Sequence, residues 1–333
     1  MDVSISPEVR IQKNSIPIIY LDSCILIELA RYASGQSSNA YKREIGELYD
    51  VLISLMRQKR ILCPSGNQLQ EMGVSKGREM AKNFLFRFTN AELYNPCLVE
   101  ETEMDLGYQA YIARTNSLDF NCSLVLKEKR SSDFPFVVHV SPIYSRDQLE
   151  KLKQEKLNGI AILNEMKKNG SIAANYETQL KNELESDFYF FLRSMENYNN
   201  SFEAFVRYSD QLAMVYKRTG IYVEDLSDSR ILDAVDKHNR FLLSEYHHKL
   251  PYKWIEAVLW THRMQRPNKI VQGDNMDTVW AAAYLPFVDY VVTDNAFCAL
   301  LKQSDLAELY KAKVYCFKTL DSLLEDLKKY SEQ

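Results

Sequence analysis

Short apolar runs typical of buried parallel strands lie near both ends of the chain, and two of them stop at an aspartate that precedes a helical pattern. Ile16–Leu21 is followed by Asp22, and Tyr290–Thr293 is followed by Asp294. Neighbouring parallel strands need a long crossover, usually a helix, and the intervening sequence supplies amphipathic patterns such as Glu44–Gln58. We therefore expect an α/β fold around a central parallel sheet.

The middle of the chain has a different pattern. Between about residues 97 and 269, apolar residues recur at three and four positions, as in long amphipathic helices. At 333 residues the chain also exceeds the usual single-domain length of about 100–200. We therefore expect an α/β domain formed by residues 1–96 and 270–333, interrupted by a mainly helical insertion at 97–269. The helices expected there are Leu149–Lys168, Ala173–Ser194, Phe202–Lys217 and Ile231–Tyr246, with an extended piece at Phe134–Val138.

Four acids lie where expected strands stop or where the next helix begins: Asp22, Glu71, Asp277 and Asp294. Ligands of an open parallel sheet bind beyond the carboxyl ends of its strands, so acids at several such ends can meet in space. A cluster of carboxylates becomes tolerable when a cation neutralises it, and Mg²⁺ and Mn²⁺ prefer oxygen ligands. The pattern predicts a divalent-metal site, with Asp274 as an accessory ligand on the same helix face as Asp277.

Each of these acids also has a structural interpretation. Asp22 and Asp294 directly precede helices, where a carboxylate caps the first backbone N–H groups. Asp274 and Asp277 lie at the start of a helix, whose dipole favours negative charge, and Glu71 alone would be an ordinary solvated helix acid. Three polar neighbours are expected either to orient ligands and water or to cap the same helices: Ser23, Thr293 and Asn295.

The motifs around the acids are similar to those of one family. Asp277 begins the segment Asp-Thr-Val-Trp-Ala-Ala-Ala-Tyr, Asp294 lies in Val-Val-Thr-Asp-Asn-Ala-Phe, and Glu71 lies in Gln-Leu-Gln-Glu-Met. Together with Asp22 after the first strand, this arrangement resembles the PIN domain family of metal-dependent ribonucleases. The matching portion is roughly 16–95 plus 270–330. The helical stretch between has no counterpart in a minimal PIN domain and resembles the elaborations of larger PIN-like proteins.

The resemblance implies a three-layer α/β/α fold with a central parallel sheet and an acidic cluster that holds Mg²⁺ or Mn²⁺. Asp22, Glu71, Asp277 and Asp294 take the ligand positions. One or two ions would bridge the carboxylates and the scissile phosphate and lower the pKa of a bound water, so that hydrolysis leaves a 5′-phosphate and a 3′-hydroxyl. RNA is expected as the substrate more than DNA, and a toxin, antiviral-defence or RNA-processing role follows from the resemblance alone.

Basic residues alternate with aromatic residues between Lys237 and Gln272, where few acids occur. Lysine and arginine can neutralise phosphates while aromatic rings stack on unpaired bases. An ordinary amphipathic helix pair with its aromatic side chains in the core gives the same pattern. The nucleic-acid-binding residues that we predict are Lys249, Lys253, Arg263 and Arg266 from this region and Lys76, Arg78 and Lys82 from a second patch near Glu71.

Composition narrows the class of protein. A formal net charge of −4 gives no general affinity for nucleic acid, so positive charge would have to line a groove. The six cysteines are scattered without a CxxC pair, which disfavours a zinc ribbon or a dense disulfide framework and fits a reducing cytoplasm. The sequence lacks a secretion-signal pattern and any apolar run of membrane-spanning length, so we expect a cytoplasmic protein without a membrane partner. Homo-oligomer formation and a regulatory protein partner are further hypotheses.

Two other functions are compatible with parts of the pattern. A haloacid-dehalogenase-like phosphatase also uses a strand-end aspartate, but it needs Asp-x-Asp, and this chain has Asp22-Ser23-Cys24. A catalytically inactive PIN-like binding or scaffold protein would keep the acids as caps and use the helical insertion to contact a partner. A G-x-x-x-x-G-K-[ST] phosphate loop and a G-x-S-x-G nucleophile elbow are both absent from the sequence, which disfavours ATP hydrolysis and serine catalysis.

Overall fold

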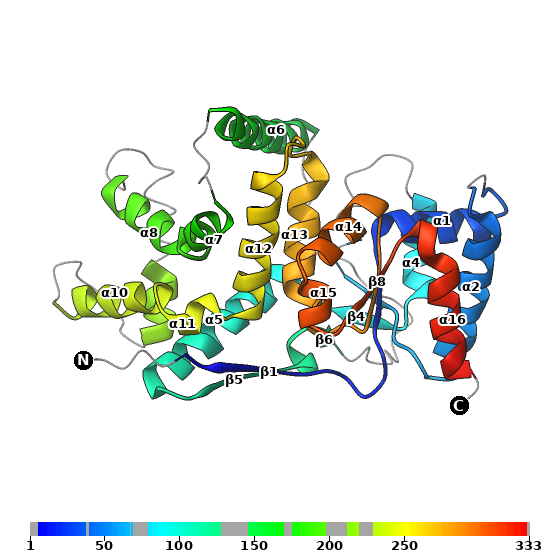
Figure 1. The fold of residues 1–333 in the computed structure, drawn as a ribbon, viewed down its shortest axis with the longest axis horizontal. Helices are drawn as coiled ribbons and strands as arrows, with labels where there is room; N and C mark the ends of the chain where they lie inside the picture. Colours follow the sequence, from blue (N-terminus) through cyan, green and yellow to red (C-terminus); the bar gives the residue numbers. More distant parts are fainter. Residues whose placement is uncertain are drawn as a thin grey trace.

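The computed structural model of the protein describes residues 6–37, 40–66, 68, 79–127, 146–169, 175–197, 212–219 and 229–331. Two short sheets lie at the centre of the α/β part of the fold (Figure 1). One is parallel, in the order β2 (Ile19–Leu21), β7 (Tyr290–Val292) and β8 (Lys313–Tyr315). The other pairs β3 (Pro64–Ser65) in parallel with β4 (Ala91–Leu93), and β4 antiparallel with β6 (Leu126–Lys127). The fold is thus mixed α/β, mainly helical, with small sheets that contain parallel strands.

A single parallel bridge joins the two sheets edge to edge. Ile18 pairs with Leu62. The Ile19 N–H donates to the Leu62 carbonyl at 2.8 Å, and the Leu62 N–H donates to the Pro17 carbonyl at 2.9 Å. The strands therefore follow one another as β6-β4-β3-β2-β7-β8, and only β6 runs antiparallel. Leu62 contributes only this bridge, and β3 begins two residues later at Pro64.

Alternate residues of the central strands point to opposite faces, as the two-residue period of a strand requires. Ile18 and Tyr20 belong to one hydrophobic cluster, whereas Ile19 and Leu21 belong to another. β7 and β8 divide their residues between the same two clusters. The sheet β2-β7-β8 is therefore buried on both faces, which explains why its strands are short, continuous apolar runs in the sequence.

Helices from the middle and the end of the chain cover the face that holds Tyr20. They are α5 (Pro96–Ala113), α12 (Pro251–Gln265), α13 (Gln272–Tyr284), α14 (Asn295–Gln303) and α15 (Leu306–Leu309). Trp280 of α13 stacks on Tyr20 with 4.4 Å between ring centroids, and Ala281–Ala283 beside it are fully buried. Their small side chains let α13 pack closely on the strand, and α12 lies alongside α13 (Figure 1).

The opposite face, which holds Ile19 and Leu21, is covered by helices that lie together on the right of Figure 1. They are α1 (Ser23–Ala33), α2 (Lys42–Arg57), α4 (Glu79–Phe88) and α16 (Leu320–Ser331). In α2, Leu48, Leu52 and Leu55 are fully buried at spacings of four and three. This is the helical periodicity that predicted α2 from the sequence.

Most of the described part of residues 97–269 is helical. Besides α5 and α12 it contains α6 (Arg146–Lys168), α7 (Tyr176–Leu184), α8 (Ser186–Asn197), α10 (Ser229–Leu242) and α11 (Glu245–His248). The single helix predicted over Ala173–Ser194 is divided at Glu185, and the one predicted over Ile231–Tyr246 is divided at residues 243–244. Phe134–Val138 and most of Phe202–Lys217 lie outside the described residues. The domain boundaries at 96/97 and 269/270 stay a prediction.

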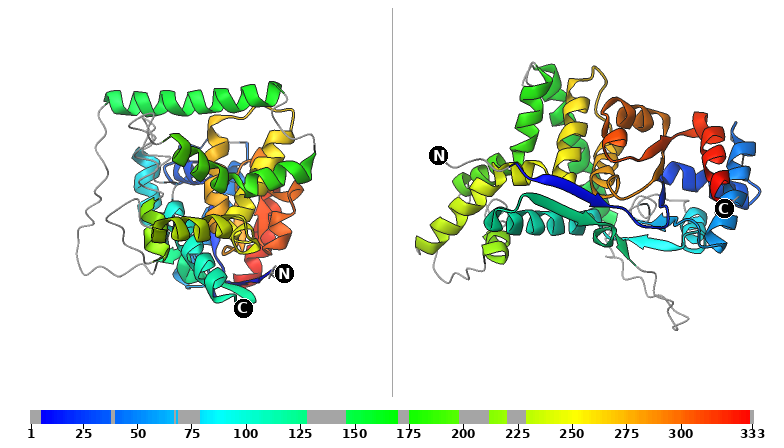
Figure 2. Two further views of the ribbon diagram at one scale, coloured as in Figure 1. Left: turned by 90° about the vertical axis from the view of Figure 1, so that its left-hand side faces the viewer. Right: turned by 60° about the horizontal axis from the view of Figure 1, so that its bottom comes forward.

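β1 (Glu8–Gln12) and β5 (Ser117–Asn121) form a separate parallel pair that was not predicted (Figure 2). In β1, Val9 and Ile11 are half-buried and alternate with three exposed polar residues. Such a strand has no apolar run to mark it in the sequence. Among the helices of the described residues, none combines the length and the apolar character needed to cross a membrane.

Candidate functional site

Asp22 follows β2 directly and caps the N-terminus of α1. Its Oδ1 accepts a hydrogen bond from the Ser23 N–H at 2.6 Å, and its Oδ2 accepts one from the Thr293 hydroxyl at 2.8 Å. Asp22 is only 6% exposed. Burial raises the pKa of its carboxyl group, and the negative charge of Asp294 raises this pKa further, while the two hydrogen bonds lower it. Thr293, predicted to orient an acid of the site, thus contacts Asp22 directly.

Asp294 lies two positions beyond β7, the parallel neighbour of β2. Its Oδ1 accepts hydrogen bonds from the N–H groups of Ala296 at 2.7 Å and Phe297 at 3.0 Å, so it caps α14. Asn295 is the exposed first residue of that helix. Both strand-end acids therefore cap helices, and they also lie close enough for the charge of Asp294 to act on Asp22. Asp22 and Asp294 can therefore cap their helices and still lie near each other.

The guanidinium of Arg263, on α12, lies beside two acids of α13. Its Nη2 is 3.5 Å from Asp274 Oδ1 and 3.6 Å from Asp277 Oδ2, and its Nη1 donates to the Thr278 hydroxyl at 2.8 Å. Arg263 is 5% exposed, and burial lowers its pKa while the two carboxylates raise it. Its Nε is buried without a hydrogen-bond partner in the part of the chain that the structure describes. Arg263 is therefore an internal countercharge for this acidic pair.

A hollow of about 450 Å³ brings these groups together with Asp294. Its charged lining consists of Arg263, Arg266, Lys269, Asp274, Asp277 and Asp294. The rim is fixed from α6, where the Lys167 ammonium donates to the carbonyls of Arg263 at 2.7 Å and Asn268 at 2.6 Å. Asp22 does not line this hollow. Three of the predicted ligands, Asp274, Asp277 and Asp294, thus share one surface, with three basic side chains around them.

The kind of donor at this hollow fits a hard divalent cation, because all three acids offer carboxylate oxygens. Their spacing does not form a closed ligand set, since no three His, Cys, Asp or Glu side chains among the described residues are placed to hold a metal ion. Arg263 supplies the positive charge at Asp274 and Asp277 that a cation would otherwise supply. A metal ion at these two carboxylates would compete with the guanidinium for their negative charge.

Glu71, the remaining predicted ligand, lies outside the described residues, as do Lys76 and Arg78. Gln68, three positions before Glu71, is described and fully buried. Gln68 Nε2 donates to the Leu21 carbonyl at 2.9 Å, and its Oε1 accepts from the Gly66 N–H at 2.6 Å. Gln68 is thereby bound to the last residue of β2, next to Asp22.

The predicted nucleic-acid-binding residues separate into different environments. Lys253, predicted to bind nucleic acid, is only 4% exposed and pairs with Asp187 at 2.9 Å, which leaves it little surface for a phosphate contact. Lys249 donates to the Ser6 hydroxyl and belongs to another hollow. The side chain of Lys82 is outside the described residues, so Arg263 and Arg266 are the two predicted basic residues placed at the acids.

Several aromatic residues between Lys237 and Gln272 lie in the core, as expected of an ordinary amphipathic helix pair. Phe241, Tyr246 and Tyr252 are buried in the hydrophobic cluster that contains Tyr20.

Lys167, which fixes the rim of the hollow, was not predicted. Its position on α6 follows the same helical pattern as its neighbours, so the sequence carries no signal that distinguishes it.

We expect Asp22→Asn to stabilise the protein by about 1 kcal/mol at pH 7, because the amide removes a buried charge and keeps the side-chain shape. Folding raises the pKa of Asp22 above its unfolded value near 3.8. The protonated carboxyl group therefore contributes its full stability below pH 3.8, and this contribution is lost as the pH rises through the folded pKa. Urea unfolding should give the same free energy of unfolding for wild type and Asp22→Asn at pH 3, and a higher one for Asp22→Asn at pH 7. The exposed Asp321→Asn is the control, and a destabilised Asp22→Asn at pH 7 would contradict this result.

Comparison of the chain with protein-family models, with curated proteins and with solved structures found no match.

Proposed function

We propose that this protein is a metal-dependent nuclease that hydrolyses phosphodiester bonds, with RNA favoured over DNA as the substrate. The observation that carries the proposal is the convergence of Asp274, Asp277 and Asp294 on one hollow, with Asp22 beside Asp294 at the end of the neighbouring parallel strand. This is the edge of a parallel sheet at which α/β proteins bind their ligands. The acids would serve as metal ligands first.

The proposal includes a PIN-like three-layer fold. Two features support it: the parallel order β4-β3-β2-β7-β8 through the Ile18–Leu62 bridge, and the two hydrophobic clusters filled by alternate residues of the same strands. Helices α1, α2, α4 and α16 would form one outer layer, and α5, α12, α13 and α14 the other. In this arrangement the carboxyl end of β7 leads to Asp294 in the hollow, and Asp22 at the end of β2 lies beside Asp294.

Mg²⁺ or Mn²⁺ is the cofactor in this proposal, held by Asp22, Asp277, Asp294 and Glu71 with Asp274 as an accessory ligand. When bound, the ion lowers the pKa of a water molecule and stabilises negative charge on the scissile phosphate. The protein's own contribution is to position the carboxylates and the substrate.

The side chains around the acids account for that positioning. Thr293 fixes one oxygen of Asp22, and the N-terminal N–H groups of α14 fix one oxygen of Asp294. Arg266 and Lys269 line the same hollow and can neutralise phosphates of a bound strand. The N-termini of α13 and α14 both open onto the hollow and add positive potential there.

A second candidate is the catalytically inactive PIN-like binding or scaffold protein. The pairing of Arg263 with Asp274 and Asp277 favours it, because these acids already have a cation within the chain. In that case the acids stabilise helix termini and the hollow binds no metal ion.

The two candidates differ in a direct assay. We expect single-stranded and structured RNA to be cut in Mn²⁺ or Mg²⁺, more slowly cut DNA, and no cutting in chelator. The 5′ ends of the products should carry phosphate, as judged by labelling with and without phosphatase. Failure to cut either nucleic acid with either ion would leave the scaffold function.

A further inference from the structure

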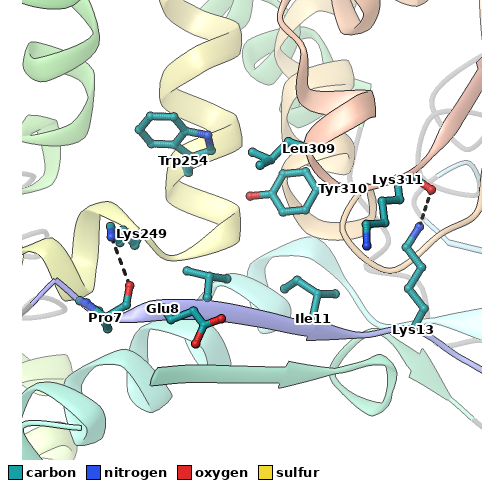
Figure 3. A pocket seen from close by; sticks show the side chains of 10 residues that line it. Pro7, Glu8, Ile11, Lys13, Lys249, Trp254, Leu309, Tyr310 and Lys311 are labelled. Atoms are coloured by element: carbon teal, nitrogen blue, oxygen red, sulfur yellow. Dashed lines mark hydrogen bonds between the residues drawn. The ribbon is translucent and has the colours of Figure 1, made fainter. Parts of the chain in front are cut away.

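A second hollow, of about 800 Å³, lies between β1 and the helices α12 and α15 (Figure 3). Its apolar lining consists of Pro7, Val9, Ile11, Trp254, Leu309 and Tyr310. The four charged residues of the lining are Glu8, Lys13, Lys249 and Lys311. Its volume lies within the range of small-molecule sites, about 300–1,000 Å³. None of the acids of the proposed nuclease site belongs to it.

The walls of this hollow keep apolar surface in contact with solvent. Ile11 points from β1 toward Leu309 and Tyr310, and Trp254 of α12 also lies across the hollow from β1 (Figure 3). Leu309 is 59% exposed, and Ile11 and Trp254 are only half-buried. An apolar ligand body would remove this surface from water, which is the main driving force for filling such a site.

The cations lie at the two ends of the apolar surface, with Lys249 at one end and Lys13 and Lys311 at the other (Figure 3). The Lys13 ammonium donates to the carbonyls of Val288 at 2.6 Å and Lys311 at 3.1 Å, and lies 3.8 Å from Asp289 Oδ1. These bonds hold it in place between two neutral acceptors and one half-buried carboxylate. Lys13 is thus a fixed cation at this end of the hollow.

Lys311 adds a second positive charge beside Lys13. Among the described residues, its ammonium has neither a hydrogen bond nor an ion pair, and its side chain is exposed. The one acid of the lining, Glu8, is already paired with Arg10 at 2.6 Å. Asp289 partly balances the charge of Lys13, so the Lys311 ammonium leaves net positive charge at this end, next to an apolar surface. Such a surface complements an anionic head on an apolar body.

We propose that this hollow binds a small amphipathic anion, with its carboxylate or phosphate at the Lys311 ammonium, beside the fixed charge of Lys13, and its apolar chain over Ile11 and Trp254. Carboxylates and phosphate monoesters share the anionic oxygens that an ammonium group recognises. A longer polyanion such as nucleic acid would leave the apolar walls unfilled. This binding site is independent of the proposed nuclease function.

The test uses ligands that share a ten-carbon chain and differ in the head group: decanoate, decyl phosphate, decanol and decyltrimethylammonium, each below its micelle concentration. Calorimetry should show one saturable site for each anion, at least 10-fold tighter than for decanol. The relative affinity of decanoate and decyl phosphate tells which head the site prefers. Equal binding of decanol or of the cationic analogue, or no saturable binding of either anion, would overturn the proposal.

Two variants locate the site. Lys311→Met keeps the side-chain length and should weaken decanoate at least 10-fold, whereas Lys302→Met, an exposed lysine outside the lining, should not change it. Trp254→Phe should remove the change in tryptophan fluorescence on binding while calorimetric binding persists. Wild-type affinity in Lys311→Met, or a fluorescence change that persists in Trp254→Phe, would show that decanoate binds elsewhere. Circular dichroism is the check that each variant is folded.

Discussion

Asp294→Asn is expected to reduce metal-dependent cleavage of RNA by at least about 100-fold, because substitutions that only support metal ligands already cost 10–100-fold. The fold should survive, since asparagine caps a helix about as well as aspartate and its carbonyl oxygen can accept the same bonds from Ala296 and Phe297. The loss therefore reports on charge at the hollow. Single-turnover cleavage of end-labelled RNA in Mn²⁺ measures it, with urea unfolding as the test of stability.

Asp321→Asn is the matched control, because it removes the same charge from an exposed position on α16. Asp277→Asn should show the same loss as Asp294→Asn, since both residues line the hollow. Full cleavage by a folded Asp294→Asn protein would remove the nuclease proposal. Loss in Asp321→Asn as well would show that the assay responds to net charge.

Arg263→Gln should destabilise the protein by about 3 kcal/mol in chelator, because removing one partner of a buried ion pair leaves the other charge uncompensated. Mn²⁺ should then restore much of this stability, about 2.7 kcal/mol at 100 times its Kd, since the cation replaces the guanidinium at Asp274 and Asp277. Urea unfolding with EDTA and with Mn²⁺ measures both effects. Wild-type protein should gain less from Mn²⁺, because Arg263 competes for the same carboxylates.

Arg266→Gln is the control for this experiment, because Arg266 lines the same hollow but is paired with Gln303 rather than with the acids. Its effect on stability should stay within about 0.5 kcal/mol in either condition. An Arg263→Gln protein as stable as wild type in EDTA would show that the guanidinium does not neutralise the acids. A destabilised variant that Mn²⁺ fails to recover would show that the two carboxylates do not take up the ion.

The strand-acid-helix units at Asp22 and Asp294 could be predicted because their causes are local. A short run buried on both faces must be continuously apolar, and the next acid caps the helix that starts there. The spacing of leucines predicted α2 for the same reason. Local causes of this kind leave a pattern within one turn or one strand of the sequence.

The environment of the basic residues depends on distant partners and could not be predicted. Lys253 and Arg263 belong to one basic and aromatic stretch, but Lys253 is buried against Ser186, 67 positions away, and Arg263 against acids of the next helix. The β1–β5 pair was missed because its strands alternate apolar residues with polar or charged ones and so contain no apolar run. Propensity and periodicity say nothing about which remote segment supplies a partner.

The order in which the strands pair has a consequence for synthesis of the protein on the ribosome. β2 can meet Leu62 early, but β7 follows only near the other end, and 271 positions separate Asp22 from its partner Thr293. At about 5–20 residues per second, this interval lasts roughly 15–55 s. During that time Asp22 has no contact with Thr293 or Asp294. A nascent or prematurely terminated chain therefore lacks the assembled acids, and any activity that depends on them arises only after translation has passed α14.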